Sequence, residues 1–139
     1  MALSAEAEVL KRELLKAVVL KKALAAAKAE WQDILWLSEQ TDEPQPLWAE
    51  DIRAEKHALQ KELAAAQLHN FALIQKVALP PRQDRIMRLR YVQGLRWQEI
   101  LERLHYTKQY ILRQHNAALE MMVKRAKIGV RSEELGVRS

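Results

Sequence analysis

The side chains in residues 107–116 are mostly of the types that form hydrogen bonds to nucleic acid. Arginine pairs with guanine through two hydrogen bonds, glutamine and asparagine pair with adenine, and lysine and threonine contact phosphates. Helical spacing would turn Ile111, Ala118 and Leu119 toward a core. The polar set then stays on or near the exposed side: Thr107, Lys108, Gln109, Tyr110, Arg113, Gln114 and Asn116. A helix with such a polar outer side can enter the major groove of DNA.

Positive charge is concentrated in the same part of the chain. The 139 residues carry 23 Lys and Arg against 18 Asp and Glu, a net charge of +5. Residues 1–79 hold 10 basic and 12 acidic groups, whereas residues 80–127 hold 11 basic and 4 acidic groups. Basic charge gathered in one segment is typical of a module that binds a polyanion, and a solvated basic helix face is the alternative. Further positive charge near the groove-facing side comes from Arg85, Arg88, Arg90 and Arg96.

Three helices are expected to position these residues. The first covers about residues 83–92, Gly94 gives a turn, and a short second helix covers residues 97–104. The third begins after Thr107, whose hydroxyl can accept a hydrogen bond from an exposed amide of the first turn. Two helices joined by a short turn, the second longer and basic, are typical of a helix-turn-helix. A basic three-helix bundle has the same spacing and stays open as an alternative.

The N-terminal half predicts two long helices that pair with each other. Residues 2–39 contain no Gly or Pro, prolines 44 and 46 interrupt the helix, and helix resumes from Trp48 to about Ala78. Apolar residues repeat at heptad spacing in both segments, with Lys21 and Lys28 as exceptions on the seam. We therefore expect an all-α fold that begins with a coiled-coil-like antiparallel hairpin over residues 1–79. Its closed end would be capped by Trp31, Trp36 and Trp48.

Prolines and a short repeat indicate the division of the chain. Pro80-Pro81 predicts a boundary between the hairpin and a helix-turn-helix domain of residues 80–128. The sequence Gly-Val-Arg-Ser at 129–132 recurs at 136–139 and is polar, which predicts a flexible tail over residues 129–139. The alanine-rich seam buries little area per residue, so we expect the hairpin to pair with a second copy as a homodimer. An intramolecular spacer is the alternative.

Several functional classes are disfavoured by what the sequence lacks. No cysteine is present, so disulfides and thiolate zinc sites are excluded. The four histidines are scattered and no catalytic motif is found, so we expect no enzyme, no cofactor and no metal. We interpret His105 as a turn residue and His115 as a recognition-helix residue or a phosphate contact. With no secretion signal and no long apolar run, a cytoplasmic protein without membrane contact is expected.

Residues 85–119 resemble region 4 of the sigma-70 family. The pattern Leu-Arg-Tyr-x-x-Gly-x-x-Trp-x-x-Ile-x-x-x-Leu-x-Tyr-Thr runs from Leu89 to Thr107, and the Ala118-Leu119 pair matches the end of that family's recognition helix. In detail the pattern is most similar to small phage and prophage late-gene transcription regulators of the ArpU/RinA kind. These also carry a helical segment before the region 4-like module, so the resemblance covers roughly residues 5–125.

The resemblance implies a sequence-specific regulator that binds double-stranded DNA in the bacterial host cell, at the nucleoid. It implies that the residues opening the recognition helix contact DNA, namely Thr107, Lys108, Gln109, Tyr110, Arg113 and Gln114, and we add Arg96 and Arg88 as basic candidates. Two positions depart from the family pattern. Arg96 stands where a small capping residue is common, and His105 stands where glycine is frequent.

Other functions are compatible with the same elements. A small-terminase-like DNA-packaging subunit also combines helical oligomerisation with helix-turn-helix modules. A sigma-like adapter would dock the region 4-like module on RNA polymerase or a sigma factor. An interaction scaffold would use the basic half to bind an acidic partner protein, but it leaves the sequence resemblance unexplained.

Overall fold

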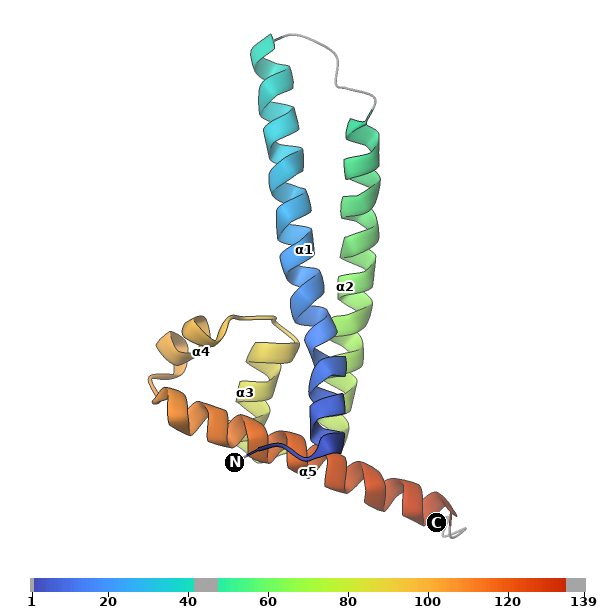
Figure 1. Ribbon diagram of the computed structural model, residues 1–139, viewed down its shortest axis with the longest axis vertical. Helices are drawn as coiled ribbons and strands as arrows, with labels where there is room; N and C mark the ends of the chain where they lie inside the picture. Colours follow the sequence, from blue (N-terminus) through green and yellow to red (C-terminus); the bar gives the residue numbers. More distant parts are fainter. Residues whose placement is uncertain (1, 42–47, 135–139) are drawn as a thin grey trace.

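The computed structural model describes residues 2–41 and 48–134, with side chains up to residue 126. All regular structure in these ranges is α-helical, as the composition predicts. The helices are α1 (Ala5–Thr41), α2 (Ala49–Val77), α3 (Pro81–Tyr91), α4 (Trp97–Leu104) and α5 (Lys108–Glu134). In Figure 1, α1 and α2 stand side by side and run in opposite directions, α3 and α4 lie beside their lower ends, and α5 crosses beneath.

The α1–α2 pair is held by small and aliphatic side chains. Ala17, Leu24 and Leu63 are buried between the two helices, and Leu59 and Ala66 pack against them. These residues belong to the expected heptad seam. Farther along α1, however, Ile34 is buried, whereas Leu35, the residue that the heptad spacing places on the seam, is half-buried. The buried stripe turns around α1 because the first half of this helix also packs against α3 and α5, which a two-helix seam does not take into account.

The tryptophans near the far end of the α1–α2 pair do not close it as expected. Trp36 is 60% exposed and Trp48 is 56% exposed, so neither forms a cap. Trp31 is half-buried, and the ammonium of Lys56 lies 5.7 Å from its ring centre. The expectation for Trp36 and Trp48 was wrong because their positions on the helices turn the rings outward. The segment between them, residues 42–47, lies outside the described residues.

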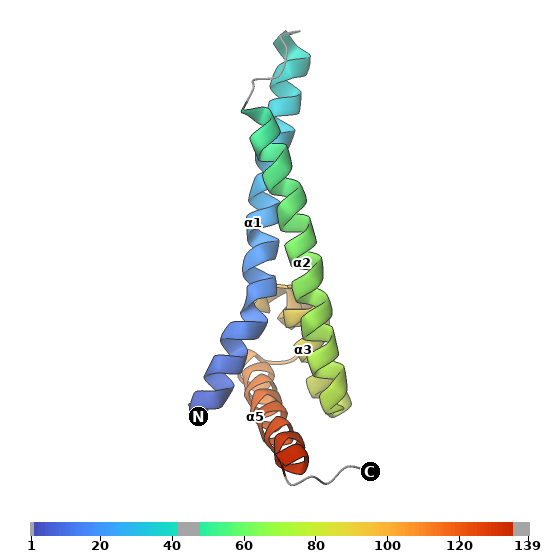
Figure 2. The same ribbon diagram turned by 90° about the vertical axis from the view of Figure 1, so that its right-hand side faces the viewer.

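One hydrophobic core joins the lower ends of α1 and α2 to α3 and α5. Figure 2 shows α5 passing between the diverging lower ends of α1 and α2. The buried residues come from all four helices: Ala7, Leu14, Val18, Ile74, Leu79, Met87, Tyr91, Ala118, Leu119 and Met122. The packing is therefore continuous across Pro80-Pro81, where the sequence predicts a domain boundary.

A buried amide ties three of these helices together. Asn70 is 1% exposed, and its Nδ2 donates to the carbonyl of Leu14 at 2.9 Å and to that of Tyr91 at 2.8 Å. Asn70 lies seven residues after Leu63, on the same stripe of α2. A buried amide requires such partners, since leaving it unpaired costs about 1–3 kcal/mol. Sequence reasoning did not single out this residue.

Lys21, which interrupts the expected seam, contacts the connection between α3 and α4. Its Nζ donates to the Gln93 carbonyl at 2.6 Å. The next residue, Gly94, has φ 70°, and a Cβ atom there would lie 2.8 Å from Cδ of Lys21. Both the backbone conformation and the close approach of Lys21 therefore favour glycine at this position.

The last helix is longer than expected. α5 continues to Glu134, whereas the sequence predicts a flexible tail from residue 129, and residues 135–139 lie outside the described range. A single glycine such as Gly129 inside a helix costs only about 1 kcal/mol, and the helix to which it belongs is already anchored in the core.

Candidate nucleic-acid interface

A three-residue connection sets the angle between α4 and α5. His105 adopts the left-handed conformation with φ 59°, and its N–H donates to the Leu101 carbonyl at 2.9 Å, which ends α4. Histidine thus takes the conformation for which glycine is common. Thr107 Oγ1 accepts a hydrogen bond from the Tyr110 N–H at 3.2 Å. This contact confirms the predicted cap and begins α5.

Glu99 stabilises the start of α4 without a small capping residue. Its carboxylate accepts hydrogen bonds from the backbone N–H and from Nε of Arg96, both at 3.1 Å. These hydrogen bonds, first the one from the backbone, hold the pKa of Glu99 below its ordinary value. The guanidinium of Arg96 is exposed at the surface and engaged with Glu99.

A second cluster of apolar side chains fixes the first turns of α5 against α3 and α4. Ile86, Leu89 and Leu95 pack with Ile100 and Ile111, and all are buried. Trp97, Leu101 and Leu104 cover this cluster. Most of these residues are those that helical spacing predicts to face a core. Because this packing holds one side of α5 against α3 and α4, the opposite side of the helix faces away from the core.

His115 belongs to the inward side of α5, so the expected phosphate contact is wrong. It is 1% exposed, and the Trp97 ring approaches it edge-on at 5.0 Å. Its Nε2 lies 2.6 Å from the Tyr91 hydroxyl, and its Nδ1 lies 2.9 Å from Oδ1 of Asn116. Spacing carried the signal, since residues 111, 115, 118 and 122 fall on one helical stripe.

The hydrogen bonds of His115 favour one neutral form of the ring. Oδ1 of Asn116 can only accept, so Nδ1 carries the proton and the Tyr91 hydroxyl donates to Nε2. Burial lowers the pKa of His115 to about 4, and the charges of Lys11 and Arg90 act in the same direction. Burial also raises the pKa of the Tyr91 phenol to about 12. This pair is therefore neutral at pH 7.

The outward side of the first two turns of α5 presents polar and basic groups. Lys108, Gln109 and Arg113 are exposed, and none has a hydrogen-bond or ion-pair partner among the described residues. Thr107, also exposed, lies directly before them. The side chains of these four residues are available for contacts with another molecule. We call these four residues the outer face of α5.

Two of the predicted residues turn toward α3 instead. Tyr110 is half-buried, and its hydroxyl accepts a hydrogen bond from Arg82 at 2.9 Å. Gln114 is half-buried, and its Oε1 accepts from Nε2 of Gln83 at 3.3 Å. Both side chains therefore lie on the flank of the outer face.

Arg88 is not brought together with the other candidates. Its Nε lies 2.7 Å from Oδ2 of Asp84, and its guanidinium lies 4.8 Å from the ring centre of Phe71 on α2. The charge of Arg88 is compensated by Asp84, and its side chain packs against the α1–α2 pair. Helical spacing placed it on a basic stripe without indicating this neighbour.

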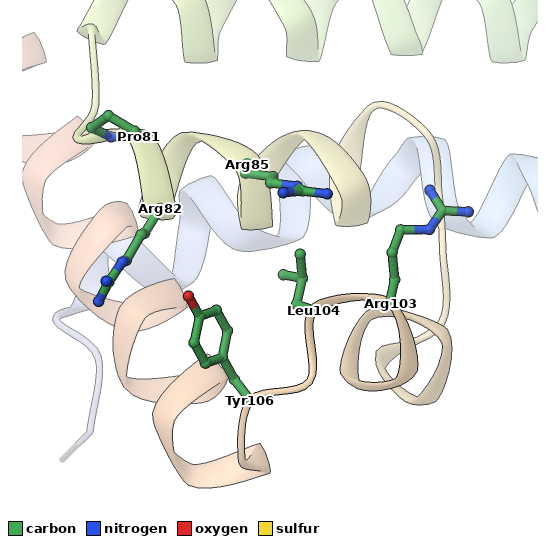
Figure 3. Close-up of a pocket in the computed structure, with 6 residues that line it drawn as sticks. All are labelled: Pro81, Arg82, Arg85, Arg103, Leu104 and Tyr106. Atoms are coloured by element: carbon green, nitrogen blue, oxygen red, sulfur yellow. The ribbon is translucent and has the colours of Figure 1, made fainter.

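A pocket beside the start of α5 joins Arg85, one of the basic residues named from the sequence, with residues that sequence reasoning did not select. It lies between α3 and the α4–α5 connection and has a volume of about 260 Å³. Figure 3 shows its lining: Pro81, Arg82, Arg85, Arg103, Leu104 and Tyr106. The Tyr106 ring lies 4.7 Å from that of Tyr110, which connects the pocket to the flank of α5. Its residues are scattered over α3, α4 and a turn, so spacing within one helix could not reveal it.

The start of the chain lies against α5 beyond the outer face. The N–H and hydroxyl of Ser4 donate to Oε1 of Glu120 at 3.2 and 2.6 Å. Glu120 follows Arg113 by two turns, on the same side of the helix. In Figure 1 the chain preceding α1 runs along α5. The basic outer face therefore ends before Glu120, and a duplex would meet the first turns of α5.

Comparison of the chain with family models, with curated proteins and with solved structures gives no match. Among the described side chains, those of residues 2–41 and 48–126, no three His, Asp or Glu are grouped so that they could hold a metal ion. No helix in that part of the chain has the length and apolar character needed to cross a membrane.

Proposed function

We propose that the protein is a sequence-specific regulator that binds double-stranded DNA and acts in transcription of a phage or prophage. In this proposal α4 and α5 form the helix-turn-helix of a sigma-70 region 4-like module, as the sequence resemblance implies. The observation that carries the proposal is the arrangement of α5. Lys108, Gln109 and Arg113 point outward without partners from a capped helix whose inner side is buried in the core.

The outer face has the chemistry required in a major groove. Arg113 offers two hydrogen bonds to guanine, and Gln109 offers a donor and an acceptor to adenine. Lys108 and the Thr107 hydroxyl suit phosphate oxygens at the start of the helix, where its dipole also attracts negative charge. Because Tyr110 and Gln114 are directed toward α3, they support the edge of this face and leave base recognition to Gln109 and Arg113.

Charge supports the same function. The 11 basic and 4 acidic groups of residues 80–127 make the half of the chain that contains α5 strongly positive. A duplex is a polyanion surrounded by counterions, so basic side chains release these ions when they contact phosphates. Binding should therefore weaken steeply as the salt concentration rises.

The α1–α2 pair is proposed as the dimerisation element. The large apolar side chains that are well exposed lie on or directly beside these two helices, apart from Tyr106: Val9, Val19, Trp36, Leu37, Trp48, Leu68 and Phe71. Pairing of two copies through these helices would remove part of this apolar area from water. A dimer then has twice the 16.2 kDa mass of the chain, whereas a packaging subunit would form a larger ring. The mass in solution distinguishes these assemblies.

Selection of bound sites from random duplex DNA tests the proposal directly. The selected duplex is then titrated with the wild-type protein, with Arg113→Ala and with Arg53→Ala as control. Arg53 is an exposed arginine at the far end of α2, in a loose ion pair of 3.9 Å with Glu50. Loss of one bidentate base contact costs about 1–3 kcal/mol, which corresponds to roughly 5–150-fold weaker binding and relaxed preference at one base pair. The proposal fails if no sequence is enriched or if both variants bind like the wild type.

A further inference from the structure

We infer that the pocket between α3 and the α4–α5 connection is a binding site for one phosphate group. When α5 lies in the major groove, this group is a phosphate of the duplex backbone. The inference rests on the proposed function and adds to it one defined contact with a backbone phosphate. A phosphate held here would set the depth and register at which Gln109 and Arg113 meet the base pairs.

The lining of the pocket suits an anion in the type of its side chains. Arg82 and Arg85 come from α3, and Arg103 comes from the last turn of α4. In Figure 3 the guanidinium of Arg85 extends toward the side of Arg103, whereas that of Arg82 points away from both. Guanidinium is planar and offers paired N–H donors that match the oxygens of a phosphate. The hydroxyl of Tyr106 can donate a further hydrogen bond. A volume of about 260 Å³ accommodates a phosphate group together with some of its water.

None of the three arginines forms an ion pair with a carboxylate among the described residues. The ion pairs among the described residues join other groups, namely Arg53 with Glu50, His69 with Glu13, Arg88 with Asp84 and Arg96 with Glu99. Arg82 bonds the neutral hydroxyl of Tyr110, and the neutral oxygen of Gln93 lies 3.5 Å from Arg103. Arg85 has no hydrogen-bond or ion-pair partner among the described residues. A phosphate oxygen beside Arg85 would supply the negative partner that this guanidinium lacks.

The position of the pocket relates it to the outer face. Tyr106 precedes the Thr107 cap, and its ring packs on that of Tyr110, which lies on the flank of α5. Arg82 bonds Tyr110 and also lies 6.0 Å from the Tyr106 ring centre. The pocket therefore borders the first turn of α5. A helix in the major groove has a sugar–phosphate backbone on either side, so a phosphate can reach such a site.

The exposure of the lining favours a phosphate that belongs to a polymer. Arg82, Arg85, Arg103 and Tyr106 are all exposed, so the pocket opens to the surface beside α5. A small phosphorylated ligand is usually enclosed over most of its surface. A backbone phosphate needs no enclosure, because the rest of the duplex is held by other contacts.

The test compares Arg85→Gln with Arg53→Gln in the full chain on the selected duplex. Arg85 is exposed and unpaired, so its replacement should leave the fold intact, which a thermal melt checks. We expect Arg85→Gln to bind roughly 10-fold more weakly and to lower the slope of log K against log salt by about 1. The ratio between the selected and a scrambled duplex should not change, since a phosphate contact carries no base preference. Arg53→Gln should match the wild type in all three quantities.

A neutral methylphosphonate placed at successive backbone positions locates the phosphate. At one position it should weaken the wild type and have no effect on Arg85→Gln, because the contact is already lost there. If the wild type binds the selected duplex and Arg85→Gln retains its affinity and its salt slope, the inference is overturned while the proposed function stands. If the wild type binds no duplex, the proposed function fails and the anchoring of DNA fails with it.

Inorganic phosphate distinguishes a free ligand from the duplex. At matched ionic strength, phosphate in place of chloride should shift the melting temperatures of the wild type and Arg85→Gln equally if only a polymer phosphate is held, since general salt effects act on both. A rise in the wild type that is absent in Arg85→Gln shows an anion site filled by free phosphate, and overturns the assignment to the duplex backbone.

Discussion

The buried imidazole of His115 predicts a defined loss of stability in mild acid. The ring is 1% exposed and its two nitrogens face Tyr91 and Asn116, an arrangement that the neutral form satisfies. The pKa of His115 is lowered from 6.5 to about 4, first by burial and then by the nearby charges of Lys11 and Arg90. The unfolded chain therefore takes up a proton at a pH where the folded chain does not. Stability is fully present above pH 6.5 and falls as the pH decreases toward 4.

The size of this loss follows from the difference between the two pKa values. Each pKa unit corresponds to 1.36 kcal/mol, so a difference of about 2.5 units gives about 3 kcal/mol between pH 7 and pH 4. This is a large part of the 5–15 kcal/mol that typically separates the folded and unfolded states of a domain. The hydrogen bond that Nδ1 of His115 donates to Asn116 opposes the lowering but is outweighed by burial.

Urea denaturation at a series of pH values measures this effect, with His115→Gln as the comparison. Glutamine retains a polar side chain but does not titrate, so the difference between the two proteins isolates the imidazole. Glu99, whose pKa is lowered by Arg96, contributes equally to both. We expect the wild type to lose about 3 kcal/mol more than His115→Gln between pH 7 and pH 4. Parallel pH profiles would refute the reasoning. So would titration of the His115 imidazole near pH 6.5 in the NMR spectrum of the folded protein.

Two further predictions concern stability at neutral pH, both measured by urea denaturation. Asn70→Ala removes the two hydrogen bonds to the carbonyls of Leu14 and Tyr91 and leaves a cavity, so it should destabilise the protein by about 2–4 kcal/mol; a change as small as that of the exposed Gln75→Ala would contradict this role. Ala78 ends α2 with φ 55°, a conformation that glycine adopts without strain. Ala78→Gly relieves about 1–2 kcal/mol of backbone strain and costs up to about 1 kcal/mol of chain entropy, so it should stabilise the protein by about 0.5 kcal/mol. Ala72→Gly, inside α2, relieves no strain and should destabilise the protein by about 1 kcal/mol.

The helices could be predicted from the sequence because local rules determine them. Proline ends α2 and starts α3, and the spacing of apolar residues predicted α4 with the limits that the structure shows. The Thr107 cap was also predicted, since it needs only a hydroxyl three residues before an exposed amide. The contacts of Lys21 and Asn70 could not be predicted, because each pairs with a carbonyl of an element distant in sequence.

The candidate site was predicted in part, because helical spacing is a local property of the sequence whereas contacts between helices are not. Helical spacing correctly turned Ile111, Ala118 and Leu119 inward, which exposes the outer face of α5. It did not show that Tyr110 and Gln114 turn toward α3, since their partners belong to another helix. A phosphate contact was expected of His115 because of its residue type. Its position on the inward stripe of α5 indicates burial instead, as the structure shows. Arg103 of α4 lines the same pocket as Arg82 and Arg85 of α3 through tertiary packing alone.

Polar contacts connect the α1–α2 pair to α5 through the core. Asn70 of α2 bonds the Tyr91 carbonyl, and the Tyr91 hydroxyl bonds His115 of α5. At the other side of the core, Arg125 of α5 donates to the carbonyls of Val77 and Ala78 at the end of α2. Because α5 is bonded to the end of α2 through Arg125, is linked to α2 indirectly through Tyr91 of α3, and is packed between α1 and α2, its angle to the pair is set by the core. In the proposed dimer, the distance between two α5 helices would then be fixed by the paired rods. Sites selected from random duplex DNA should accordingly show one half-site spacing, whereas a linker between independent domains would permit several.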